Sequence, residues 1–175
     1  MSNSIRSRIL ILAILMALSC RSAIADSPIQ LSLFDPIQLR PASESITGIR
    51  LSLLYGKNQN MTGLDFGLVN HLTGDAVAFQ WGAVGYVEGD FTGWQDNIVN
   101  ITKGSFLGLQ GGTVNYSKSC EGVQWGLVNY TTKMHGVQVG FINYAGTMNG
   151  LQIGIANIIG SGGFMPIFPI INWSF

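Results

Sequence analysis

A pattern of alternating hydrophobic and polar positions repeats every 14 or 15 residues through most of the chain. Its clearest copies are GVQWGLVN from Gly122, GVQVGFIN from Gly136 and GLQIGIAN from Gly150. Less regular copies begin at Gly48, Gly63, Ala78, Gly93 and Gly108. Together these copies cover residues 48–157 without a gap, which is typical of a protein built from one repeated structural unit.

Each copy alternates with a period of two, so Leu151, Ile153 and Ile155 point one way while Gln152 and Gly154 point the other. A helical Gly-x-x-x-Gly motif needs an uninterrupted apolar stretch of about twenty residues, and here a polar residue interrupts every copy. Turn-forming segments such as HLTGD and TTKMH separate the copies. The pattern therefore predicts an all-β fold with one strand per repeat.

Two architectures fit such strands. In a parallel β-solenoid each repeat is one coil, and Gln124, Gln138 and Gln152 would stack as a ladder of amides. In a small antiparallel β-barrel of about 8–10 strands the apolar positions would face lipid and the glutamines the interior. The identity of the sequence motif in neighbouring strands favours the solenoid. In an antiparallel meander neighbouring strands run in opposite directions, so equivalent positions do not lie side by side and need not carry the same residue.

The composition and the last residues favour the barrel. Charged residues make up 10% of the chain, where soluble domains have about 25%. Residues 166–175 end in Phe175, preceded by Trp173 and Ile171 at alternate places, and this end resembles the closing strand of bacterial outer-membrane barrels. We predict the barrel, with the solenoid as the alternative. Residues 29–33 would add a degenerate strand, and the partners implied are outer-membrane lipid and the barrel-insertion machinery.

Several positions break the pattern. Asp96, Gly111 and Thr113 fall on the nominally apolar side of their strands. Gly85 replaces the asparagine of one copy, and Asn97 replaces the second glycine of the next. These departures fit neither architecture better than the other.

The N-terminal residues have the features of a secretory signal peptide. Arg6 and Arg8 precede the apolar residues 9–18, and Ala23 and Ala25 fit a cleavage site. We predict a signal peptide at residues 1–25 and a single repeat-built domain at 26–175. Lipidation at Cys20 is an alternative. The expected location is the bacterial outer membrane or cell surface, or otherwise the periplasm or the medium.

The remaining residues exclude some classes of function. Residues 26–175 contain six Lys and Arg and nine Asp and Glu, a net charge of minus three (six minus nine), so they offer no basic stripe for nucleic acid. Cys120 is their single cysteine, and no internal disulfide is expected. Their stability must come from packing and hydrogen bonds.

The phrase in GVQWGLVNY and GVQVGFINY, together with the ending PIINWSF, resembles the bacterial surface-repeat family described from leptospiral sequences. The resemblance covers residues 46–175 and departs from the phrase at Gly85 and Asn97. It implies a surface or outer-envelope location and no reaction.

Residue types that could carry chemistry have simpler interpretations. His71 and His135 are 64 residues apart with no metal-ligand spacing, so we predict solvated histidines in turns. Cys120 occupies the repeat slot of Met134 and Met148, which predicts an apolar packing residue. Trp81 and Trp125, which share a repeat phase, would form a barrel girdle or be ordinary core or surface aromatics.

The carboxylates are scattered over turns and separate strands, and we interpret them as solubilising charge. They are Asp65, Asp75, Glu88, Asp90 and Asp96. We therefore predict no catalytic, cofactor-binding or metal residues. The predicted function is that of a non-enzymatic outer-membrane or surface repeat protein with a structural or interaction role. The alternative is an exported soluble β-solenoid that binds a protein or glycan partner.

Overall fold

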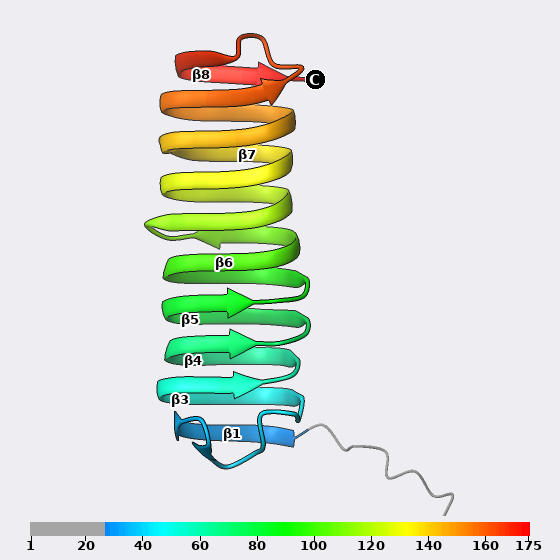
Figure 1. Ribbon diagram of the computed structural model, residues 1–175, viewed down its shortest axis with the longest axis vertical. Helices are drawn as coiled ribbons and strands as arrows, with labels where there is room; N and C mark the ends of the chain where they lie inside the picture. The colour runs from blue at the N-terminus through cyan, green and yellow to red at the C-terminus, as the bar shows by residue number, and fades with distance from the viewer. Residues whose placement is uncertain (1–26) are drawn as a thin grey trace, which may run out of the picture.

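The computed structural model describes residues 27–175, which wind into a parallel β-solenoid of about seven turns (Figure 1). All strands belong to one sheet in the order β2-β1-β3-β4-β5-β6-β7-β8. The strands are β1 (Ser27–Phe34), β2 (Ile37–Gln38), β3 (Ile46–Asn58), β4 (Met61–Leu72), β5 (Ala76–Val87), β6 (Phe91–Gly111), β7 (Val114–Ser161) and β8 (Ile167–Ser174). Within the described residues, no helix has the length and hydrophobicity needed to cross a membrane.

Consecutive coils lie side by side in parallel, with equivalent repeat positions paired. Gly48 pairs with Gly63, and Gly63 in turn pairs with Ala78. The predicted antiparallel barrel is therefore wrong, and the solenoid alternative is correct. Stacking places the same repeat position side by side in neighbouring coils. Each repeated glutamine therefore lies next to a glutamine, and each repeated asparagine next to an asparagine. The degenerate strand expected at residues 29–33 is confirmed, since Gln30 pairs in parallel with Arg50.

A ladder of buried glutamine amides runs the length of the interior. Gln95 Nε2 donates to Gln80 Oε1 at 2.9 Å, and Gln152 Nε2 donates to Gln138 Oε1 at 2.8 Å. The intervening donations follow the same direction, each side chain giving its proton to the preceding coil. Every one of these side chains is fully buried, so the ladder satisfies amides that would otherwise be costly to bury.

A second ladder, of asparagines, runs beside the first with the opposite direction of donation. Asn100 Nδ2 donates to Asn115 Oδ1 and Asn143 Nδ2 donates to Asn157 Oδ1, both at 2.8 Å. Each amide also reaches a carbonyl near the second glycine of a repeat, as Asn143 does with Ile153 O at 2.9 Å. The asparagine thereby fixes the bend that follows the glycine.

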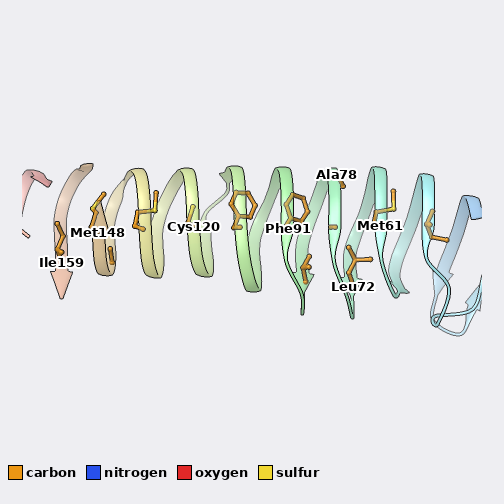
Figure 2. Packing of buried hydrophobic residues seen from close by; sticks show 13 residues of the cluster. Met61, Leu72, Ala78, Phe91, Cys120, Met148 and Ile159 are labelled. Atoms are coloured by element: carbon orange, nitrogen blue, oxygen red, sulfur yellow. The ribbon is translucent and has the colours of Figure 1, made fainter. Parts of the chain in front are cut away.

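Two rows of mainly apolar side chains complete the interior (Figure 2). One row contains Met61, Phe91, Cys120 and Met148 and the other contains Leu72 and Ile159, with the labelled members of the two rows nearer opposite sides of the coil. The rings of Phe91 and Phe106 stack at 5.4 Å between adjacent coils. The core therefore combines two rows of mainly amide side chains with two rows of mainly apolar ones, although Thr102, Ser117 and Thr131 lie in the row of Leu72 and Ile159.

The first glycine is required by its backbone conformation in seven of the eight repeats, and Ala78 takes this place in the other. Gly136 has a φ of 137°, a region that side-chain-bearing residues rarely adopt. A β-carbon there would also collide with the carbonyl oxygen of Gly122 in the preceding coil. Glycine recurs at this place because the positive φ and the close approach of the preceding coil together leave no room for a side chain there.

The ends of the stack are formed by antiparallel strands. β2 pairs antiparallel with β1, and β8 pairs antiparallel with β7, with Gln152 opposite Asn172. Asn172 Nδ2 donates to Asn157 O at 3.3 Å and so continues the internal amide bonding. The strand predicted to close a barrel instead covers the last coil, and Phe175 is 91% exposed beyond it. Pro169 lies in β8, and proline on an edge strand hinders pairing with a further strand.

Gly85 and Asn97, the two residues that differ from the repeat motif, compensate for each other in space. A β-carbon on Gly85 would lie 2.5 Å from Asn97 Nδ2. That nitrogen instead occupies the space and donates to Asn100 Oδ1 at 2.7 Å and to Gln80 Oε1 at 3.2 Å. Asn97 thus supplies from the neighbouring coil the amide that Gly85 lacks.

A buried ion pair begins the glutamine ladder. Arg50 and Asp65 occupy the glutamine position of β3 and β4 and meet in a bidentate contact at 2.7 and 2.8 Å. Both side chains have no solvent exposure. Gln80 Nε2 then donates to Asp65 Oδ2 at 2.8 Å. The interpretation of Asp65 as solubilising charge is wrong, because its repeat phase turns it inward.

Candidate functional site

The main exposed feature of the solenoid is a continuous surface of hydrophobic side chains, here called the apolar face. It comprises the outward residues of the glutamine strand and those just after the second glycine of each repeat. Its exposed members are Ile49, Leu51, Leu53, Leu64, Leu68, Trp81, Trp94, Ile98, Leu109, Leu127, Val139, Phe141, Ile142, Ile153 and Ile155. A monomeric soluble protein rarely exposes so extended an apolar surface, which marks an interaction site.

Charge is concentrated away from the apolar face. Lys103, Lys118, Lys133 and Glu88 follow the asparagine of their repeats on the opposite side of the coil. Arg50 and Asp65 are internal, and Asp96 is the one charged residue among the described residues that line the main hollow of the apolar face. The solenoid is therefore amphipathic around its circumference.

A groove of about 1470 Å³ runs along the apolar face, parallel to the axis of the solenoid. It extends from Leu31 and Ile37 near the N-terminal end to Trp125 and Leu127 in β7. A second hollow of about 540 Å³ shares Trp125 and continues toward Ile155. The floor lies at the second glycine of the repeats, where no side chain fills the space between the flanking apolar residues.

The groove is interrupted by a cluster of small and polar residues, here called the polar notch. It consists of Asp96, Asn97, Gly111, Gly112 and Thr113, most of which line the groove. The three residues that fell on the nominally apolar side of their strands, Asp96, Gly111 and Thr113, therefore gather in one place, because the register stacks coils 93–107 and 108–121. These interruptions of the apolar pattern are visible in the sequence, but only the parallel stacking of the coils shows that they form one site.

Aromatic rings border the polar notch. Trp81 is the register partner of Asp96 in the preceding coil. The indole of Trp125 lies over Gly111, where an added β-carbon would approach its ring carbons to 2.5 Å. Trp125 also meets Trp94 edge to face, with ring centroids 6.3 Å apart. Of the two sequence-based alternatives for these tryptophans, the structure supports surface aromatics.

A hydrogen-bonded set of side chains lies outside the apolar face. Tyr55 Oη lies 2.7 Å from His71 Nδ1, and His71 Nε2 lies 2.9 Å from Glu88 Oε1. The bond from His71 lowers the pKa of Glu88, while burial raises the pKa of Tyr55. His71 lies in a strand and is 15% exposed, so its prediction as a solvated turn residue is wrong. Neither hollow adjoins this set.

Sequence reasoning missed this set because its members are 16 and 17 residues apart. That spacing is close to one repeat, and it is the signal that could have found them once parallel stacking was known. His135, by contrast, is exposed as predicted, although it lies within β7.

Three tyrosines after the repeat asparagine form a stack. The rings of Tyr116, Tyr130 and Tyr144 are nearly parallel and stacked, with centroids 5.5 and 4.6 Å apart. Because each inner ring face is covered by the next tyrosine, this row offers ring edges rather than open platforms. It is therefore poorly suited to stacking against sugar rings.

The turn carboxylates have a structural role. Asp75 Oδ1 accepts from Asp90 N at 2.8 Å, and Asp90 Oδ1 accepts from Ser105 N at 2.6 Å. Asn60 does the same for Asp75 in the preceding turn. These side chains cap backbone groups between coils, and residues 27–175 contain no group of three or more His, Cys, Asp or Glu placed to hold a metal ion.

Cys120 is an apolar packing residue, as predicted, and is 2% exposed. Burial raises the pKa of its thiol from 9.0 to about 12. We expect a disulfide reagent at pH 8 to label the folded chain on the order of fiftyfold more slowly than the urea-unfolded chain, since the thiolate is the reacting form. Absorbance of the released thiol measures both rates, and equal rates would contradict the buried placement.

No protein-family model, curated protein or solved structure matches this chain. The resemblance to the leptospiral surface-repeat family stays a prediction. The predicted signal peptide and the lipidation alternative at Cys20 lie outside the described residues.

Proposed function

We propose that this chain is an exported, non-enzymatic repeat protein of the bacterial envelope that attaches to a lipid surface through its apolar face. The observation that carries the proposal is the uneven distribution of exposed side chains: hydrophobic residues line one side of the coils, and most of the surface charges, which end at Lys133, lie away from that side. Membrane-surface proteins bind by burying such a face at the boundary between headgroups and acyl chains.

The dimensions of the apolar face suit this role. Strands stack at about 4.8 Å, so the repeats at residues 48–157 span roughly 35 Å along the axis. With three outward rows, the face covers on the order of 700 Å² per molecule. Trp81 and Trp94 are 57% and 41% exposed on it, and tryptophan is favoured at membrane interfaces.

Vesicle flotation tests the proposal with a double variant, Leu68→Glu with Leu127→Glu. Both leucines are about half exposed on the apolar face. We expect the wild-type chain to float with vesicles of mixed phosphatidylcholine and phosphatidylglycerol, and the variant to bind on the order of a hundredfold more weakly, since two apolar contacts are lost.

The matched control carries the same charges on the same two coils. Thr73→Glu with Thr132→Glu lies on the opposite side, where both threonines are exposed, and we expect vesicle binding within about twofold of wild type. A wild-type chain that stays with the soluble fraction, or two variants that behave alike, would contradict the proposal.

A protein partner is the second candidate for the same apolar face, because on the order of 700 Å² per partner approaches a standard protein interface of about 800 Å². A wild-type chain that does not float but forms a complex sensitive to the leucine variant supports it. A partner bound along the amide ladders is disfavoured, since the glutamine and asparagine side chains are buried.

A further inference from the structure

The polar notch contains a negative charge, Asp96, that needs a positively charged partner when the apolar face is buried. Asp96 is half buried and lines the groove among hydrophobic side chains. Within the described residues, no cation lies in salt-bridge contact with its carboxylate. If the apolar face rests on lipid, this charge loses water, and its desolvation must be compensated by a positive group from the lipid itself.

The residues around Asp96 define the shape of that positive group. Trp81 stands beside it on the preceding coil, and the indole of Trp125 covers Gly111 on the following side. The indole of Trp125 fills the space above Gly111, so the part of the notch that opens to the groove is lined by Asp96, Gly112 and Thr113. A carboxylate between aromatic rings is suited to an alkylated ammonium, which is attracted to ring faces as well as to the negative charge.

We infer that the polar notch binds the ammonium of a zwitterionic lipid headgroup, with phosphatidylcholine as the best-fitting class. The inference rests on the proposed attachment to lipid and adds its headgroup selectivity. The bound headgroup places its ammonium at Asp96, while the acyl chains extend from the neighbouring apolar groove walls at Leu68 and Leu127. Anionic headgroups are disfavoured, because they would bring a second negative charge to the desolvated carboxylate.

The test compares flotation with pure phosphatidylcholine vesicles and pure phosphatidylglycerol vesicles that have identical acyl chains. We expect wild-type protein to prefer phosphatidylcholine by about tenfold at 0.15 M salt. Asp96→Asn, which keeps the size of the side chain, should reduce this preference to about twofold or less. Tetramethylammonium chloride should weaken wild-type binding to phosphatidylcholine more than sodium chloride does at the same concentration.

Two further variants separate the polar notch from general electrostatics. Asp90→Asn removes the same charge on the opposite side, where Asn60 already fills the equivalent capping position, and it should retain the wild-type preference. Trp81→Leu keeps an apolar side chain but loses the ring, and it should lower binding to phosphatidylcholine about threefold to fivefold while leaving phosphatidylglycerol unchanged.

The outcomes are distinguishable. Equal binding of wild type to both kinds of vesicle, or an Asp90→Asn variant that loses the preference as fully as Asp96→Asn does, overturns headgroup selection and leaves the proposed function intact. Binding to neither kind overturns both. An unchanged preference in Asp96→Asn overturns the assignment to the polar notch.

Discussion

Replacing Arg50 alone with glutamine is expected to lower the free energy of unfolding by about 3–5 kcal/mol. The change leaves the carboxylate of Asp65 buried with Gln80 as its remaining side-chain donor. Asp65→Gln alone should cost a similar amount, because it strands the guanidinium. The double variant places glutamine at both positions, as the other coils have it, and should lie within about 2 kcal/mol of wild type.

Urea unfolding followed by circular dichroism measures all three variants. Lys118→Gln, on an exposed lysine, removes a positive charge without burying anything and should change stability by less than about 0.5 kcal/mol. If the double variant loses as much free energy of unfolding as the two single variants together, the ion pair does not take the place of a glutamine–glutamine hydrogen bond in the ladder.

The second large effect is expected at Gly85 and Asn97. Gly85→Asn alone forces an amide into space that Asn97 fills, and should cost about 2–3 kcal/mol. Asn97→Gly alone removes the donor to Asn100 Oδ1 and Gln80 Oε1 and should cost about 1–3 kcal/mol. Together the two changes restore the repeat phrase, so the double variant should be more stable than either single variant.

A double-mutant cycle gives the coupling between these sites, which we expect to be about 2 kcal/mol in favour of the pair. As the control, Gly85→Asn combined with the exposed Lys118→Gln should show additive losses, since the two residues share no contact. Additivity in the Gly85 and Asn97 cycle itself would contradict the view that the Asn97 amide occupies the place left by Gly85.

The repeat boundaries and strand content could be predicted from the sequence because alternation with a period of two is a local property. The direction of the neighbouring strand could not, because the apolar side of each strand fits lipid around a barrel equally well. Gln124, Gln138 and Gln152 decide the matter only through contacts between coils. The low charge content that favoured a barrel has another cause, namely an interior filled with amides and an exterior that is apolar on one side.

The candidate site was visible in the sequence only as irregularity. Asp96, Gly111 and Thr113 lie in different repeats and become one notch through the parallel register. The contacts of Tyr55, His71 and Glu88 could not be predicted from the sequence. A histidine and a glutamate 17 residues apart are expected to be neighbours only once the length of a coil is known. Cys120 was predicted correctly, since its role depends on repeat phase alone.

The opposite donation of the two amide ladders has a consequence for how long such a solenoid can grow. A single file of aligned amides is a row of dipoles whose ends would acquire partial charge, as the ends of a helix do. Here the glutamine file points its donors toward the N-terminal coils and the asparagine file toward the C-terminal coils. Their fields oppose one another, so each added coil contributes little net dipole, and repeats can be gained or lost without an electrostatic penalty that increases with length.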